Sequence, residues 1–264
     1  MSDPPADLEL ALSLADAADR ITMQRFGAAD LIVDTKPDLT PVSEADRAVE
    51  LELRRRIAAA HPGDALIGEE FGDERAGAAR RWVIDPIDGT KSYVRGMPTW
   101  STLIALQVDG AASVAVVSMP AIGRRWWARR GGGAFVSELG RQRPVHVSRV
   151  ATLADAQMAW SGPEDWEAVG RLERILALAR ACWRTRGIGD AWQYMLVAEG
   201  AAELALDPAV SLWDLAAPAL IVEEAGGRYS DLRGSPRPDG GSGLASNGLL
   251  HDAALKLLGP DASP

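Results

Sequence analysis

The sequence predicts a layered protein in which an α+β half, residues 1–148, is joined to a smaller α/β half, residues 149–264. Two helical patterns at the start are followed by a series of short apolar runs, which favours helices packed on a largely antiparallel sheet. Beyond residue 149, strand-like and helix-like patterns alternate, as they do in α/β units. A chain of 264 residues that is 47% hydrophobic can bury the core that such layers need.

The first half begins with helices and continues with strands. Apolar periodicity predicts a helix over about residues 6–26, ended near Gly27, and a second from Ser43 to Ala60, stopped by the His-Pro-Gly sequence at 61–63. Ser43 is the expected N-cap of the second helix. Short apolar runs, two of them joined by an Asp-Gly hairpin turn, predict strands at 65–68, 81–85, 101–108, 113–118, 124–130 and 141–147.

The second half alternates between the two kinds of element. Strands are expected at about 157–160, near Trp183, at 202–206 and at 244–246. Helices are expected at about 165–180, 190–199, 214–225 and 249–258. The stretch from 231 to 243 is rich in proline and glycine, so it is expected to form a surface loop.

The turn DPIDGT at residues 85–90 follows an apolar strand and carries two carboxylates and a hydroxyl. Asp85 and Asp88 offer the hard oxygen ligands that Mg²⁺ prefers. Gly89 allows close approach of the backbone to a ligand, and Thr90 is expected to cap a helix whose N–H groups face the same place. Such a turn standing alone is more typical of an Asx hydrogen bond than of a metal site.

Three more acidic residues lie at expected ends of elements. Glu69 follows the strand at 65–68, Asp46 lies just inside the helix that Ser43 begins, and Asp214 opens a later helix. Taken together with the turn, they favour a metal site over isolated turns and caps. Lys36 precedes Asp46 and is interpreted either as a cation that orients this loop or holds phosphate, or as a solvated lysine.

The order of these motifs, GEE at 68–70, DPIDGT at 85–90 and WDLAA at 213–217, resembles the inositol monophosphatase family of Mg²⁺-dependent, lithium-sensitive phosphatases. The resemblance covers nearly the whole chain. It implies a layered αβαβα sandwich, the fold shared with sugar phosphatases of the fructose-bisphosphatase type, with the active site between the halves. It also implies a homodimer and two or three Mg²⁺ per active site.

The resemblance also implies roles for individual residues. The implied metal ligands are Glu69, Asp85, the carbonyl of Ile87, Asp88 and Asp214. Asp46, Glu69 and Thr90 would form the catalytic set, in which Thr90 and Asp46 hold and deprotonate the attacking water. The amides of Gly89 and Thr90 would bind the phosphate. Hydrolysis would proceed by in-line attack of metal-activated water on the phosphate monoester, without a phosphoenzyme.

The residues that would contact the rest of the substrate point to its chemistry. The resemblance places Arg186, Gly189 and Asp190, together with Asp88, Asp207 and Asp214, on the substrate side. Two extra carboxylates, Asp190 and Asp207, suit a cationic group such as an amine. The pattern RGIGD, with Asp-Pro before Trp-Asp, resembles the histidinol-phosphate phosphatases of the inositol monophosphatase type. The expected activity is therefore the histidinol-phosphatase step of histidine biosynthesis.

Other functions are weighed against this one. An inositol-1-phosphate or broad sugar-phosphate phosphatase would use the same two acids to bind hydroxyl groups. A catalytically silent metal- or phosphate-binding protein is disfavoured because every implied ligand is present. With a net charge of −9, a nucleic-acid surface is not expected. The chain shows no signal-peptide or membrane-spanning pattern and a single cysteine, Cys182, so a cytoplasmic protein without disulfides is expected.

Overall fold

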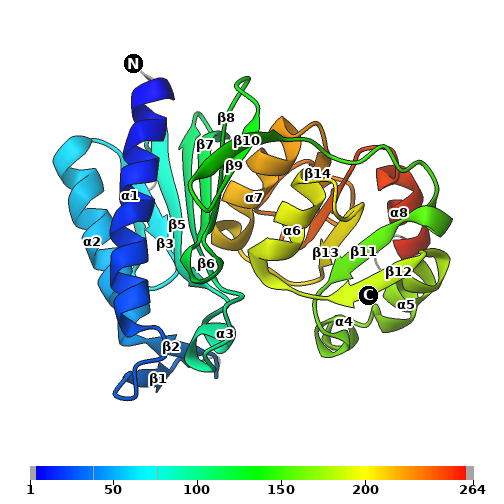
Figure 1. The fold of residues 1–264 in the computed structure, drawn as a ribbon, viewed down its shortest axis with the longest axis horizontal. Coiled ribbons are helices and arrows are strands. Elements are labelled where there is room, and N and C mark those ends of the chain that lie inside the picture. The colour runs from blue at the N-terminus through cyan, green and yellow to red at the C-terminus, as the bar shows by residue number, and fades with distance from the viewer. Residues whose placement is uncertain (1–3, 38, 76, 260–264) are drawn as a thin grey trace.

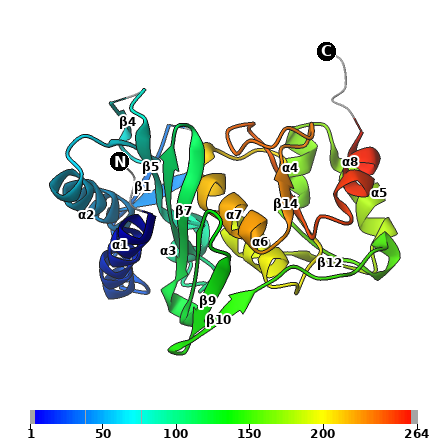
Figure 2. The ribbon, with the colours of Figure 1, turned by 90° about the horizontal axis from the view of Figure 1, so that it is seen from above.

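The structure, a computed structural model, describes residues 4–37, 39–75 and 77–259. Five layers follow one another across the molecule in Figure 1: a helix pair, a large sheet, a second helix pair, a smaller sheet and a third group of helices. The view from above in Figure 2 shows the same sequence of layers from α1 and α2 to α5 and α8. The predicted αβαβα sandwich is therefore confirmed.

The large sheet has the strand order β10-β9-β8-β7-β6-β5-β3-β4, in which only the β3–β5 pair is parallel. Its strands are β3 (Ala65–Gly68), β4 (Gly72–Glu74), β5 (Arg80–Asp88), β6 (Ser101–Val108), β7 (Ala111–Met119), β8 (Arg124–Arg129), β9 (Ala134–Glu138) and β10 (Arg141–Val145). Side chains of β5 alternate between its two faces: Trp82 and Ile84 pack in the core toward α1 and α2, and Val83 packs in the core on the other face. Both faces of this sheet are thus covered.

The outer helices are α1 (Pro4–Arg25) and α2 (Glu44–Ala60), and a two-stranded ribbon of β1 (Val33–Thr35) and β2 (Pro41–Ser43) lies between them in the chain. Ser43 is the N-cap of α2, as predicted: its hydroxyl accepts from the amides of Ala45 and Asp46. This cap fixes the position of Asp46, the third residue of the helix, whose side chain accepts the backbone N–H of Ser43 in return.

The middle layer consists of α6 (Asp190–Ala198) and α7 (Leu212–Glu224), which share one core with both sheets. The smaller sheet has the order β12-β11-β13-β15-β14, with β11 (Gln157–Trp160), β12 (Arg184–Gly187) and β13 (Leu204–Asp207) parallel. The strands β14 (Arg228–Ser230) and β15 (Gly243–Ser246) complete it. Three helices, α4 (Pro163–Ala168), α5 (Leu172–Ala181) and α8 (His251–Leu258), cover its far face.

Some predicted elements were wrong or missed. The single helix expected at 165–180 is two helices, because Gly170 adopts a φ of 69° that no α-helix continues through. The strand expected at 81–85 continues to Asp88 through an irregularity between Asp85 and Asp88. The sequence interpretation also missed β9, a five-residue strand between two glycine-containing turns.

Candidate active site

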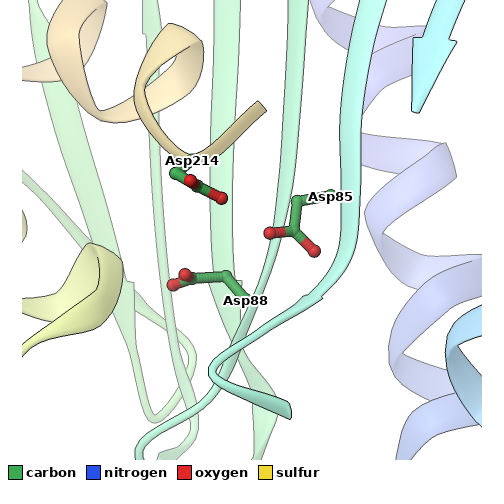
Figure 3. A group of neighbouring side chains, drawn as sticks. All are labelled: Asp85, Asp88 and Asp214. Atoms are coloured by element: carbon green, nitrogen blue, oxygen red, sulfur yellow. The ribbon is translucent and has the colours of Figure 1, made fainter. Parts of the chain in front are cut away.

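Asp85, Asp88 and Asp214 converge between the large sheet and the middle helices. Their ligand oxygens lie within 4.8 Å of one another, and Figure 3 shows the three carboxylates facing a common point. The two β5 residues reach it because the strand irregularity lies between them. Asp214 reaches it from the third position of α7, where its Oδ2 accepts the amide of Ser211 at 2.7 Å.

Burial and mutual repulsion raise the pKa values of Asp85 and Asp214 in this cluster. Burial, and then the carboxylates of Glu69 and Asp88, raise the pKa of Asp85 well above its ordinary value. Burial and then Asp88 raise the pKa of Asp214 to about 8. Within the described residues, no lysine or arginine forms an ion pair with any of the three. Buried, convergent carboxylates of this kind fit a divalent cation, which supplies the missing positive charge.

Asp88 connects the large sheet with the middle helices. Burial, followed by the charge of Asp190, raises its pKa well above the ordinary value. Its Oδ2 accepts the hydroxyl of Ser101 on β6 at 3.0 Å and the amide of Ala191 on α6 at 2.7 Å. These two bonds orient the carboxylate and leave Oδ1 for another partner.

Glu69 lies outside the group of three. Its Oε1 accepts from the Nζ of Lys36 at 2.7 Å, and the same ammonium binds Glu70 at 2.7 Å. Lys36 is therefore not a solvated lysine: it holds the GEE turn through two ion pairs. Glu69 still lies close enough to contribute to the raised pKa of Asp85.

The expected water-activating pair is in contact. The Thr90 hydroxyl lies 3.1 Å from Asp46 Oδ1 and 3.0 Å from the carbonyl oxygen of Ile87, so it can donate to either. Asp46 Oδ2 accepts the amide of Ser43 at 2.8 Å. Burial raises the pKa of Asp46, which suits a group that accepts a proton.

The prediction that Thr90 caps a helix was wrong. The N-cap of α3 (Thr90–Val94) is Gly89, and Thr90 is the first helical residue, because its hydroxyl turns toward Asp46. Gly89 has a φ of +83°, and an added Cβ there would lie 2.9 Å from Asp190 Oδ2. Glycine is therefore required on both conformational and steric grounds.

Two of the substrate-side acids lie beside this cluster. Gly189 is the N-cap of α6 with a φ of 69°, and Asp190 follows it with a φ of 52°. Burial, and then the charge of Asp207, raise the pKa of Asp190 to about 7. Burial raises that of Asp207 to about 6, although hydrogen bonds from Tyr194 and Gln193 oppose the shift.

Arg186 is placed differently. It is exposed on β12, an edge strand of the smaller sheet, and its Nη1 donates to the backbone oxygen of Thr185 at 2.8 Å. The role of Arg186 toward the substrate stays a prediction.

The sequence interpretation missed the residues that hold Asp207. The hydroxyl of Tyr194 donates to Asp207 Oδ2 at 2.7 Å, and the amide of Gln193 donates to the same oxygen. Both lie on the first turn of α6 after Asp190, so their position next to a predicted substrate residue was the available signal.

None of the described helices is both long and apolar enough to cross a membrane.

Comparisons with known proteins agree with this geometry. A model of the inositol monophosphatase family matches residues 6–259. The histidinol-phosphatase of Mycobacterium tuberculosis is 53% identical over 253 residues, covering 96% of this chain and 97% of the relative. That of Streptomyces coelicolor is 54% identical over 263 residues, covering 98% of each. The solved structure of an IMPase from Thermotoga maritima superposes with a TM-score of 0.86 at 28% identity, covering 96% of each chain. This chain is a member of the inositol monophosphatase family.

Proposed function

We propose that this protein is a Mg²⁺-dependent phosphatase that hydrolyses L-histidinol phosphate in histidine biosynthesis. The observation that carries the proposal is the second pair of acids, Asp190 and Asp207, placed against the three convergent carboxylates. Histidinol phosphate carries an amine and an imidazole. Charge-assisted hydrogen bonds to two carboxylates favour such a cation over a neutral polyol. The two histidinol-phosphatases that are more than half identical to the chain support this choice.

The metal-binding residues would be Asp85, Asp88 and Asp214, with Glu69 and the carbonyl of Ile87. When bound, Mg²⁺ supplies Lewis-acid chemistry that makes water more acidic and offsets the charge of the phosphate. Family resemblance extends the proposal to two or three Mg²⁺ per site, inhibition by lithium, a homodimer and a cytoplasmic location.

The protein's own groups would position the reactants. Thr90 and Asp46 orient the attacking water, and Asp46 accepts its proton. The amides of Gly89 and Thr90 donate to the phosphate oxygens. The water oxygen would form a bond to phosphorus as the bond to the ester oxygen breaks on the opposite side. The departing alkoxide would take up a proton from solvent water, and the proton accepted by Asp46 would return to solvent. The products are the alcohol and inorganic phosphate.

Phosphate release from L-histidinol phosphate tests the proposal. With Mg²⁺ present, the purified protein should release phosphate, EDTA should stop the reaction, and excess Mg²⁺ should restore it. An undiminished rate in EDTA would contradict the metal-dependent mechanism. The second candidate, an inositol-1-phosphate phosphatase, shares this metal dependence and differs only in the preferred ester.

A further inference from the structure

Glu50 on α2 is a fully buried carboxylate to which the proposed mechanism assigns no role. Its side chain is 0% exposed. Its Oε2 accepts the amide of Glu70 at 2.8 Å, and its Oε1 accepts the amide of Phe71 at 3.2 Å. These amides belong to the two residues that follow Glu69, so both carboxylate oxygens of Glu50 bind the turn that carries a proposed metal ligand.

Gly68 and Arg54 fix the position of Glu50. A Cβ added at Gly68 would lie 2.2 Å from Glu50 Oε1, so the carboxylate packs directly on the backbone of the strand end. Arg54, one helical turn later, donates to Glu50 Oε1 from Nε at 2.8 Å, and its Nη2 donates to the carbonyl of Gly72 at 2.6 Å. Glu50 and Arg54, here called the α2 clamp, therefore hold the turn from residue 68 to residue 72 at both of its ends.

The α2 clamp lies on the same helix face as Asp46. Residues four apart in an α-helix are neighbours on one face, so Asp46 and Glu50 point to the same side of α2. Asp46 contacts the Thr90 hydroxyl, and Glu50 contacts the amides after Glu69. One helix thus sets the distance between the turn that contains Thr90 and the turn that contains Glu69.

We propose that Glu50 is a positioning residue that fixes Glu69 relative to Asp85 and thereby sets the affinity of the site for divalent cations. The inference rests on the proposed metal site and adds to it a residue that does not touch the metal. Mutation of the groups that hold metal ligands in place typically lowers metal affinity by about 10- to 100-fold.

The variant Glu50→Gln tests the proposal with little change in volume. Glutamine keeps one acceptor oxygen. If its amide nitrogen replaces Oε2, the Glu70 amide loses its acceptor, and if it replaces Oε1, the Phe71 amide and the Arg54 guanidinium lose theirs. We expect the dissociation constant for Mn²⁺, titrated without substrate, to rise at least about tenfold. The Mg²⁺ concentration for half-maximal phosphate release should rise in parallel, and kcat at saturating Mg²⁺ should recover most of its original value.

The matched control is Glu52→Gln on the same helix. Glu52 forms ion pairs with Arg55 and Arg56 of the same helix, and no contact of the described residues joins it to the turn at 68–72, so its replacement should leave Mn²⁺ affinity within twofold of the original. A role of Glu50 in folding alone would lower the melting temperature or the active fraction without moving the half-saturating Mg²⁺ concentration. A folded Glu50→Gln protein with unchanged Mn²⁺ affinity would overturn the proposal.

A second variant covers the case in which Glu50→Gln does not fold. Arg54→Met removes the cation of the clamp and its bond to Gly72 while leaving Glu50 in place. We expect it to weaken Mn²⁺ binding several-fold, and unchanged binding would overturn the proposal. The Mn²⁺ titration does not depend on which ester the protein hydrolyses. If the wild-type protein hydrolysed no phosphate ester and Glu50→Gln still bound Mn²⁺ more weakly, the proposed function would be rejected and the role of Glu50 would be retained.

Discussion

At the scale of single residues, Asp88 shows how the site depends on contacts from distant parts of the chain. One of its carboxylate oxygens accepts bonds from β6 and from the start of α6, and its position opposite Asp85 and Asp214 follows from them. Asp88 as a whole residue is 7% exposed. A change of charge at this position therefore acts on the cluster directly, because solvent does not screen it.

We expect Asp88→Asn to reduce kcat/KM at least about a hundredfold for any phosphate ester at physiological Mg²⁺, because an amide lacks the charge that a divalent cation requires. The measurement is phosphate release with the wild-type protein alongside. Asp109→Asn is the matched control, since Asp109 lies in the β6–β7 hairpin turn with a φ of 51° that asparagine also adopts. Retained activity in Asp88→Asn would mean that Asp88 is not a metal ligand.

A second residue-scale prediction concerns specificity. Asp190→Asn should lower kcat/KM for histidinol phosphate by about 10- to 100-fold, because it replaces a charge-assisted hydrogen bond to a cation with a neutral one. The loss on inositol-1-phosphate should be much smaller, because a hydroxyl group binds an amide nearly as well. Equal losses on the two esters would remove Asp190 as the specificity residue.

At the scale of elements, accuracy of the sequence interpretation followed the strength of local signals. The cap at Ser43, the β6 strand and the Asp-Gly turn were predicted well, because each depends on neighbouring residues in the chain. The break at Gly170 and the strand β9 were not, since isolated glycines and short strands carry weak patterns. Thr90 was assigned to a cap from its neighbours in the chain, whereas its contact with Asp46, 44 residues away in the sequence, was implied only by the family resemblance.

The joint between α8 and the smaller sheet provides a prediction of pH dependence. His251 is fully buried between the hydroxyls of Ser230, 2.8 Å from Nε2, and Ser246, 2.9 Å from Nδ1. Burial lowers its pKa from 6.5 to about 4. Its neutral form is thus favoured in the folded state, so its stabilising effect is complete above about pH 6.5 and is lost as the pH falls toward 4.

The free energy of unfolding should accordingly fall by up to about 3 kcal/mol between pH 6.5 and pH 4 on account of this histidine. Urea titrations across this range should show a shallower pH dependence in His251→Gln than in the wild type. His61→Gln, at a half-buried position on the other side of the molecule at the end of α2, should keep the wild-type slope. If the free energy of unfolding depended on pH in the same way in all three proteins, the lowered pKa of His251 would be contradicted.

At the scale of the whole molecule, the site lies where two separate sheets meet a shared helical layer. Asp85 and Asp88 come from the large sheet, Asp190 and Asp214 from the middle helices, and Asp207 from the smaller sheet. The middle helices pack in one core with both sheets. The boundary at residues 148 and 149 remains a prediction about the division into halves.

This arrangement explains which parts of the site were accessible from the sequence. The acidic residues lie at ends of elements, where sequence patterns mark boundaries, so the candidate ligands could be chosen before the structure was known. Their convergence could not be derived from local patterns, because it depends on the packing of sheets and helices. The supporting residues Glu50, Gln193 and Tyr194 were missed for the same reason: each acts on a segment distant in sequence.

The most direct test of the central claim is kcat/KM for L-histidinol phosphate against that for inositol-1-phosphate, measured on the same protein with saturating Mg²⁺. The paired acids Asp190 and Asp207 predict a preference of at least about a hundredfold for histidinol phosphate, equivalent to about 2.7 kcal/mol of transition-state binding. Equal values, or a preference for the inositol ester, would contradict the account of these two acids and would favour a broad-specificity phosphatase.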